Sequence, residues 1–300
     1  MKIDHVVRRI RIDHPERFRL ADRDTANTHG VDCDKEAAKQ HLADDVERLR
    51  DLQERLYAEN RWAVLVILQG MDASGKDGIV KHVMSGINPQ GCDVRSFKQP
   101  SAEELDHDFL WRCAMRLPER GRIGIFNRSY YEEVLIARVH PEILTSEKLP
   151  KEVVTRRIWQ RRFEDIRAFE RTLAQNGTLV LKFFLHISKK EQRQRFLARI
   201  KEPAKRWKLS MSDVSERKLW DRYMAAYEEM IRATSHADGR WYVVPADNKS
   251  FARLVVAAAI VGALDRLDLE IPKVKGKALR ELEKVERALL SEGKTGKKRG

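Results

Sequence analysis

Hydrophobic and polar positions alternate along the middle of the chain in a pattern that predicts a parallel sheet with helices on both faces. Short apolar runs are separated by segments in which apolar residues recur every three or four positions. The predicted strands span residues 62–68, 92–97, 122–126, 178–187 and 241–244. The predicted helices span residues 76–85, 102–117, 152–175, 189–201, 213–233 and 250–267. This order predicts one main α/β domain with a five-stranded parallel sheet.

Segments on either side of this pattern complete the predicted organisation. A helix is expected from Asp34, which can cap it, through Leu56, because apolar residues between them form one stripe. We interpret it as packed on the sheet, with a subunit contact as the alternative. Residues 1–33 show no clean period and are expected to form an arm that lies on the domain or is partly disordered. The domain would span residues 34–270, followed over 271–300 by a basic helix and a disordered tail.

The distribution of charge narrows the class of partner. The chain has 59 Lys and Arg against 46 Asp and Glu, a formal net charge of +13. Residues 271–300 hold ten of these basic residues and four Glu, so this segment supplies six of the thirteen excess charges. The body of the protein is therefore only mildly basic. This favours a local phosphate site and makes a nucleic-acid-binding surface the less favoured partner.

Cysteines and apolar runs indicate the compartment. Cys33, Cys92 and Cys113 are too few and too scattered for a disulfide framework, which indicates a reducing compartment. The charged start of the chain does not resemble a signal peptide. The longest apolar runs, residues 62–68 and 254–264, are shorter than the roughly 20 residues that span a bilayer. We therefore expect a soluble cytoplasmic protein with no membrane partner.

The most informative motif is GMDASGKD at residues 70–77, which follows a predicted strand and opens a predicted helix. It fits G-x-x-x-x-G-K, a loop whose backbone N–H groups surround phosphate oxygens while the lysine adds positive charge. The following helix N-terminus also favours an anion. A chance glycine-rich turn is the alternative. The predicted phosphate-binding residues of this segment are Gly70, Ala73, Ser74, Gly75, Lys76, Asp77 and Lys81.

A magnesium site is expected beside this loop. Asp77 occupies the position at which Ser or Thr usually ligates magnesium, so Asp72 inside the loop is the candidate ligand. Its alternative role is to form the turn. Asn127 and Arg128 end the third predicted strand and should project toward the loop, where Arg128 suits a phosphate. Asn127 stands where an acidic, metal-linked residue is frequent.

Three further charged residues have two interpretations each. Glu132 and Glu133 could supply the missing carboxylate, or could be solvated charges that the helix dipole favours. Lys182 interrupts an apolar strand, which is costly unless the lysine is paired. We count Lys182 among the phosphate-binding candidates, although a structural role is slightly favoured.

A lid is predicted between two helices at residues 202–213, EPAKRWKLSMSD. Pro203 ends the preceding helix, and Asp213 with Glu216 forms a capping pair for the next. A short basic linker at this place can close over phosphates and exclude water, although a solvated turn is the alternative. Its basic and aromatic residues are Lys205, Arg206, Trp207 and Lys208. Trp207 could stack on a base or pack in the core.

Taken together, these segments resemble the polyphosphate kinase 2 family. The resemblance rests on residues 69–112, 124–142, 181–196, 202–213 and 241–254, and it covers roughly residues 34–269. The segment NRSYYEEVL differs from the aspartate-led, tryptophan-containing version of other branches. It resembles the subgroup that phosphorylates both nucleoside monophosphates and diphosphates. The resemblance implies a thymidylate-kinase-like, P-loop kinase core with a helical lid, magnesium, polyphosphate as donor, and a homodimer or homotetramer.

The resemblance also implies roles for individual residues. Asp72 and Lys76 would be essential, Arg128 would grip the phosphates, and Lys205, Arg206 and Lys208 would belong to the lid. Asn127 replaces an aspartate that is metal-linked elsewhere in the family. The metal would then depend on Asp72 and on Glu132 or Glu133.

The predicted activity is magnesium-dependent transfer of a phosphoryl group between inorganic polyphosphate and AMP or ADP, which forms ADP or ATP. Catalysis of this reaction is mainly positioning and charge neutralisation, so no strong base is required. Lys76, Arg128 and magnesium would stabilise the transition state. An ATP-dependent small-molecule kinase and a nucleic-acid-binding P-loop protein are the alternatives.

Overall fold

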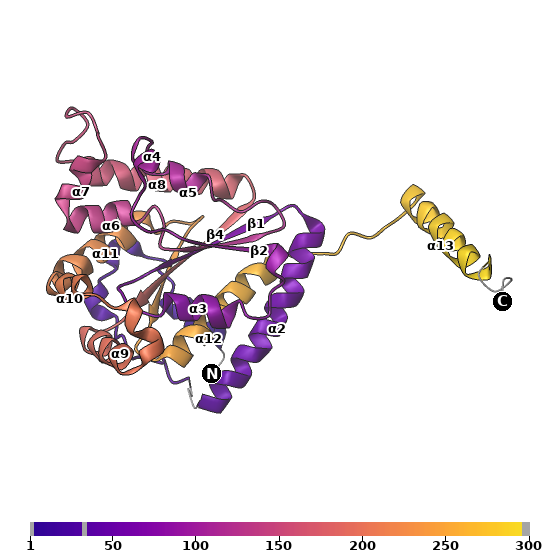
Figure 1. Ribbon diagram of the computed structural model, residues 1–300, viewed down its shortest axis with the longest axis horizontal. Helices are drawn as coiled ribbons and strands as arrows, with labels where there is room; N and C mark the ends of the chain where they lie inside the picture. The colour runs from indigo at the N-terminus through magenta and orange to yellow at the C-terminus, as the bar shows by residue number, and fades with distance from the viewer. Residues whose placement is uncertain (1–2, 32–34, 296–300) are drawn as a thin grey trace. The chain divides into compact units, whose positions relative to one another are not determined.

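A parallel five-stranded sheet forms the centre of the protein (Figure 1). The computed structural model describes residues 3–31 and 35–295. The strands are β1 (Ala63–Gln69), β2 (Cys92–Ser96), β3 (Ile123–Asn127), β4 (Thr178–His186) and β5 (Trp241–Pro245). Their order across the sheet is β2-β3-β1-β4-β5, and every pairing is parallel. The prediction of a five-stranded parallel α/β sheet is confirmed, and β1 lies at its centre because both of its faces are apolar.

Helices cover both faces of this sheet. On one side α12 packs against α1, α2 and α3, and on the other α11 packs against α6 and α8 (Figure 1). The helices are α1 (Ile3–Ile10), α2 (Lys35–Glu59), α3 (Lys76–Val83), α4 (Ala102–Leu105), α5 (Trp111–Ala114), α6 (Glu132–Val139), α7 (Pro141–Ser146), α8 (Ile158–Gln175), α9 (Lys189–Lys201), α10 (Met211–Lys218), α11 (Trp220–Thr234), α12 (Lys249–Asp265) and α13 (Lys277–Thr295). Short 3-10 turns are η1 (Pro15–Arg17), η2 (Leu20–Asp22), η3 (Pro89–Gly91) and η4 (Pro203–Lys208).

Three predicted helices differ from the observed ones. The helix expected over 102–117 is interrupted between α4 and α5, where the Asp108 carboxylate accepts a hydrogen bond from the backbone N–H of Leu110. The helix expected from residue 152 begins at Ile158. The helix expected over 213–233 is divided into α10 and α11. Asp213 is also not its cap: Ser210 caps α10, and the Asp213 carboxylate accepts the Ser210 N–H in a capping box.

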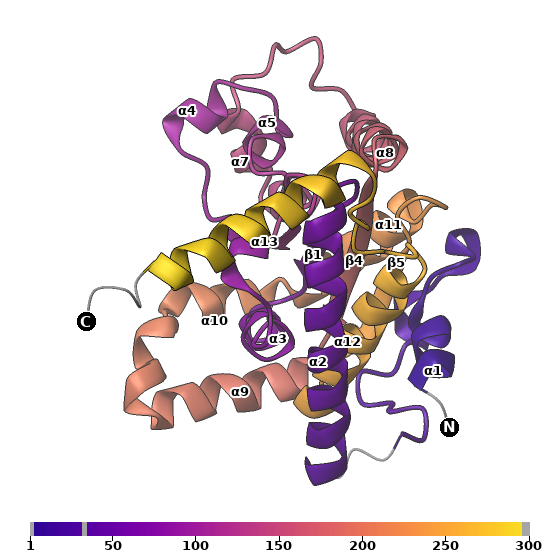
Figure 2. The ribbon, with the colours of Figure 1, turned by 90° about the vertical axis from the view of Figure 1, so that its right-hand side faces the viewer.

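The N-terminal arm is part of the same compact unit as the sheet, which extends to Leu269. Val6, Ile10 and Phe18 are buried, and α1 contacts α12 and β5 (Figure 2). The backbone N–H of Ile12 donates to the carbonyl oxygen of Trp241 at 2.8 Å. The described part of the arm therefore lies on the domain.

Residues 270–300 form a second unit that contains α13. Leu279, Leu282 and Leu289 of this helix are exposed within that unit. The predicted helix cap Asp34, the thiol of Cys33 and the last five residues of the predicted tail lie outside the described residues. Among the described residues, no helix is long and apolar enough to cross a membrane.

Candidate active site

The GMDASGKD segment forms a tight loop between β1 and α3. Gly70 and Gly75 have φ values of 149° and 116°, and Ala73 has a φ of 62°. A Cβ atom at Gly70 would lie 2.8 Å from the carbonyl oxygen of Leu185, so only glycine fits there. Three positive φ values within six residues curl the backbone in the manner of a loop that surrounds an anion.

Lys76 lies inside this loop. Its Nζ atom donates to the carbonyl oxygens of Gly70 at 2.6 Å and Met71 at 3.3 Å. Burial, followed by the nearby charge of Arg128, lowers the pKa of Lys76 to about 8. The ammonium group is thus desolvated and has no carboxylate within ion-pair distance among the described residues. A bound phosphate would supply the missing negative charge.

Arg128 brings two carboxylates to the mouth of the loop. Its backbone N–H extends the β3–β1 ladder by donating to Leu68, which places the side chain beside the start of the loop. Nη2 donates to Oδ1 of Asp72 at 2.7 Å, and Nη1 donates to Oε2 of Glu132 at 3.2 Å. Nearby carboxylates, Glu132 first, raise the pKa of Arg128. With a φ of 66°, Arg128 is also a non-glycine residue in the left-handed region, which is common at functional sites.

Glu132 and Glu133 point to different surroundings. Glu132 contacts Arg128, whereas Oε1 of Glu133 accepts a hydrogen bond from Nη2 of Arg112 at 2.9 Å. Burial raises the pKa of Glu133 to about 7. Of the two, only Glu132 lies with Asp72 at the loop. Within residues 3–31 and 35–295, no three His, Cys, Asp or Glu side chains form a group that could hold a metal ion by themselves.

Asn127 and Asp77 contact each other across the gap between β3 and α3. Nδ2 of Asn127 donates to Oδ1 of Asp77 at 3.0 Å, and Nζ of Lys208 donates to Oδ2 of the same carboxylate at 3.0 Å. Burial would raise the pKa of Asp77, but the hydrogen bonds from Lys208 and Asn127 lower it below its usual value. Asp77 therefore remains an anion that connects the loop helix to the predicted lid.

The predicted lid consists of η4 and the first residues of α10. Lys208 is the lid residue that reaches α3, whereas Lys205 pairs with Glu202 at 2.6 Å. Nε of Arg206 donates to the carbonyl oxygen of Ile200 at 2.8 Å. Trp207 is 78% exposed, so it does not pack in the core.

Two residues that sequence analysis missed hold the loop from α9. Nε2 of Gln192 donates to the backbone oxygen of Asp72 at 2.9 Å. Nη1 of Arg195 donates to the backbone oxygens of Ala73 and Ser74, each at 2.9 Å. Both side chains are buried although most of α9 is polar. Two polar side chains three positions apart on one helix face only weakly indicate a buried contact with the loop, because solvated helices contain the same pattern.

Lys182 does not belong to the phosphate site, and its assignment as a phosphate-binding residue is wrong. Its side chain is fully buried, and Nζ donates to Oε2 of Glu170 at 2.6 Å and to the Tyr131 hydroxyl at 2.9 Å. A third bond reaches the backbone oxygen of Thr234 at 2.7 Å. All three ammonium protons are therefore satisfied within the core. Lys81, by contrast, is exposed on α3.

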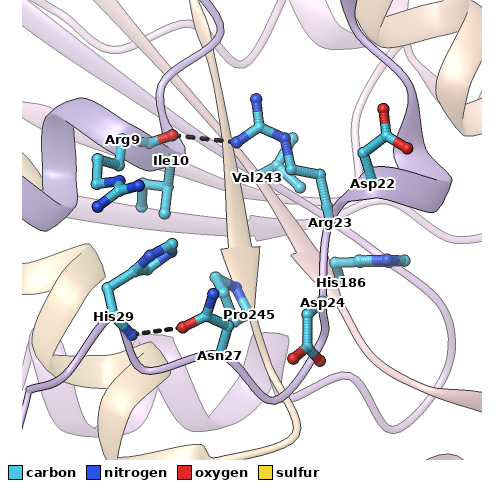
Figure 3. Close-up of a pocket in the computed structure, with 10 residues that line it drawn as sticks. All are labelled: Arg9, Ile10, Asp22, Arg23, Asp24, Asn27, His29, His186, Val243 and Pro245. Atoms are coloured by element: carbon cyan, nitrogen blue, oxygen red, sulfur yellow. Dashed lines mark hydrogen bonds between the residues drawn. The ribbon is translucent and has the colours of Figure 1, made fainter.

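A cavity of about 220 Å³ lies between the N-terminal arm and the ends of β4 and β5 (Figure 3). Arg9 and Arg23 line it together with Asp22 and Asp24, so its formal charges balance. His186 also lines it, and burial lowers the pKa of this imidazole to about 4, which keeps it neutral at pH 7. None of the predicted phosphate-binding residues lines this cavity.

Comparisons with known proteins identify the family of this chain. The family model for polyphosphate kinase 2 matches residues 32–272. A relative from Rhodopseudomonas palustris, named ADP-polyphosphate phosphotransferase, is 56% identical over 85% of this chain and 89% of its own. A relative from Meiothermus ruber, named AMP/ADP-polyphosphate phosphotransferase, is 45% identical over 89% of this chain and 96% of its own.

A solved structure gives the same result for the fold. The crystal structure of polyphosphate kinase 2 from Arthrobacter aurescens TC1 superposes with a TM-score of 0.85. It is 39% identical in sequence and covers 97% of each chain. The P-loop kinase-like architecture expected from the sequence is therefore confirmed. Both the family model and the relatives span most of the chain, and this protein belongs to the polyphosphate kinase 2 family.

Proposed function

We propose that this protein is a polyphosphate-dependent nucleotide kinase, which transfers a phosphoryl group between inorganic polyphosphate and AMP or ADP to form ADP or ATP. The observation that carries the proposal is the convergence of Lys76, Arg128 and Asp72 at the loop between β1 and α3. The names of the relatives from Rhodopseudomonas palustris and Meiothermus ruber support the donor and the acceptors.

The side chains of the site act by neutralising charge and by positioning. The loop N–H groups and Lys76 bind phosphate oxygens, and the guanidinium of Arg128 binds the group in transfer. Negative charge on that group is thereby offset by groups that are already in position. Terminal phosphates of both substrates are ionised near pH 7, so the reaction needs no strong base. Gln192 and Arg195 keep the loop backbone in its curled form.

A magnesium ion fits the donor set. Mg²⁺ is usually bound by one or two carboxylates together with substrate phosphates and waters. Asp72 and Glu132 provide two carboxylates that meet at Arg128. Asp72 would hold the ion, with Glu132 as the second group, and the amide of Asn127 would orient one of its waters. When bound, the ion supplies positive charge to the phosphate oxygens.

The lid would close over the phosphates and reduce transfer to water. Lys208 already contacts Asp77, which connects the lid to the helix that follows the loop. Acceptance of AMP as well as ADP is inferred from the segment NRSYYEEVL. A neutral amide at Asn127 lowers the negative charge near the acceptor phosphates. We also infer a homodimer or homotetramer and a cytoplasmic location, consistent with the free thiols of Cys92 and Cys113.

One assay tests this proposal. The protein is incubated with magnesium, polyphosphate and either AMP or ADP, and the nucleotides are identified over time. ATP should form from ADP with no other donor, and AMP should give ADP first and ATP later. Turnover only with ATP and a small-molecule acceptor would contradict the use of polyphosphate. Absence of ADP from AMP, in a preparation that converts ADP to ATP, would contradict the acceptor range alone.

A further inference from the structure

Gln192 bridges the phosphate-binding loop and the helix whose first residues belong to the predicted lid. Its side chain is 1% exposed on α9, and its Nε2 atom donates to the backbone oxygen of Asp72 at 2.9 Å. Its Oε1 atom accepts a hydrogen bond from Nη1 of Arg217 on α10, also at 2.9 Å. η4 connects α9 to α10 (Figure 2). One buried amide therefore contacts both the loop and the far end of the lid helix.

The chemistry of these two contacts requires an amide at this position. A backbone oxygen only accepts hydrogen bonds and a guanidinium only donates them, so the side chain between them needs a donor at one end and an acceptor at the other. A glutamate would place an oxygen against the oxygen of Asp72, and a lysine would repel Arg217. Arg217 is itself fixed, because its Nη1 atom also donates to the backbone oxygen of Lys189 at 2.8 Å.

Arg195, which also holds the loop, differs from Gln192 in its other contacts. Nη2 of Arg195 donates to the backbone oxygens of Ala246 and Asp247, which follow directly after β5. Arg195 therefore ties the loop to the sheet. Gln192 ties the loop to α10 instead. Of these two residues, Gln192 is the one through which a displacement of the lid helix can reach the loop.

We propose that Gln192 is a positioning residue that transmits the position of the lid helix to Asp72. This inference rests on the proposed function, in which Asp72 holds magnesium and the lid excludes water. With α10 in place, Arg217 orients the amide and the amide holds the backbone of Asp72, whose Oδ1 atom accepts a hydrogen bond from Arg128 at 2.7 Å. When α10 shifts, the amide loses its orienting partner and the carboxylate is held less firmly.

Hydrogen exchange tests this link in the ligand-free protein. Exchange of the backbone amides of residues 70–77 is followed by mass spectrometry in the wild type, in Gln192→Met and in Arg217→Met. Both variants should raise the exchange rate of the loop by about twofold to tenfold, the effect of one lost hydrogen bond. Gln194→Met is the matched control, because it replaces an exposed glutamine of the same helix, and it should leave the rate unchanged.

A magnesium titration tests the consequence at the site. The magnesium concentration for half-maximal ATP formation from ADP and polyphosphate should rise about tenfold in Gln192→Met and in Arg217→Met, as is typical when a group that orients a metal ligand is lost. Gln192→Glu keeps an acceptor for Arg217 but loses the donor to Asp72, so it should show the same rise. The variant Gln192→Met/Arg217→Met should need no more magnesium than Gln192→Met, because the two side chains act in sequence.

Two results would overturn the inference. Loop exchange in Arg217→Met equal to that in Gln194→Met would show that α10 is not linked to the loop. Multiplied increases in the magnesium requirement of the double variant would show that the two side chains act independently. If Gln192→Met does not fold, Arg217→Met tests the same link from a half-buried position.

Failure of the proposed function has a different outcome. Absence of ATP formation from ADP and polyphosphate by the wild-type protein would contradict that function. The exchange comparison needs no substrate, so it would still decide whether Gln192 links the lid helix to the loop.

Discussion

Lys76 at the start of α3 and Lys182 on β4 are two buried lysines, and they differ in what surrounds the ammonium group. Their exposed fractions are 8% and 0%. Nζ of Lys182 lies 2.6 Å from a carboxylate oxygen of Glu170, whereas Nζ of Lys76 donates, among the described residues, only to the carbonyl oxygens of Gly70 and Met71. A buried cation requires a compensating charge. The fold supplies a directly paired carboxylate to Lys182, whereas the carboxylates near Lys76 act from beyond ion-pair distance, so we expect a ligand to pair with it.

One chain segment connects the two lysines. The hydroxyls of Tyr130 and Tyr131 donate to Oε1 of Glu170 at 2.9 and 2.7 Å. The next residue is Glu132, which contacts Arg128 at the mouth of the loop. The buried pair therefore fixes the position of the segment that carries the site. Lys182, whose hydrogen bonds are all within the protein, stabilises the structure. Lys76, which has no directly paired carboxylate among the described residues, is the lysine that we expect to bind substrate.

The largest expected effect is on stability. Lys182→Met should lower the free energy of unfolding by about 3–5 kcal/mol, because Glu170 would keep a buried charge without its partner. Lys76→Met is the same chemical change but should not lower it, because it removes a buried ammonium group that has no directly paired carboxylate among the described residues. Urea unfolding followed by circular dichroism measures both. If Lys182→Met does not fold, Glu170→Gln/Lys182→Met, which removes both charges, should recover part of the loss. Equal losses in the two single variants would contradict the comparison.

The second effect is on turnover. Lys76→Met should reduce the rate of ATP formation from ADP and polyphosphate by about a hundredfold to a thousandfold, as loss of one preorganised charge does. The measurement uses the folded variant from the unfolding experiment, with Arg266→Ala as the control for loss of a cation elsewhere. A decrease of less than about tenfold would show that Lys76 is not required in the transition state.

Two carboxylates, Asp72 in the loop after β1 and Glu133 on α6 after β3, extend the comparison to anions. Asp72→Asn should lower turnover about a hundredfold and raise the magnesium concentration needed for half-maximal rate, because one of the two carboxylates at Arg128 is lost. Glu133→Gln should leave that magnesium concentration within about twofold, since Glu133 bonds to Arg112 instead. Magnesium titrations of both variants check this. An unchanged magnesium concentration for Asp72→Asn, with a raised one for Glu133→Gln, would make the metal assignment wrong. Glu132→Gln would then be tested next.

The smallest effect is a dependence on pH. The pKa of Lys76 is lowered to about 8 by burial, so the ligand-free protein loses this charge as the pH rises above that value. Affinity for polyphosphate should then fall by up to about tenfold per pH unit. Lys76→Arg should remove this dependence, because arginine stays protonated. Kd values between about pH 6.5 and 9.5 measure it. If Kd still depended on pH in Lys76→Arg, the titration would belong to another group.

The lowered pKa of Lys76 also affects the free energy of unfolding, which should rise with pH where the affinity for polyphosphate falls. An unfolded lysine titrates near 10.4, so between about pH 8 and 10 the unfolded state binds more protons at this position than the folded state. The contribution of Lys76 to the free energy of unfolding therefore rises with pH in that range. Unfolding of the ligand-free wild type and of Lys76→Met across this range separates the contribution from those of other lysines.

The sequence by itself determined the elements that depend on local patterns. The predicted strands lie within two residues of the observed ones at either end. For β1, β3, β4 and β5 the reason is that burial on both faces requires nearly continuous hydrophobic residues, whereas the edge strand β2 is half-buried to exposed. The loop at residues 70–77 was equally predictable, since its glycines, its lysine and its flanking strand and helix are consecutive in the chain. The same reasoning was less accurate for the interrupted helices, where Asp108 and Ser210 bond to nearby backbone groups.

Only the tertiary structure decided which charged side chains share the site. Glu132 and Glu133 are adjacent in sequence, yet one contacts Arg128 and the other Arg112. Lys182 proved structural because its partner Glu170 lies on α8. Gln192 and Arg195 hold the loop from more than a hundred residues away. A side chain's partner depends on its direction and on segments distant in sequence, and local periodicity contains neither.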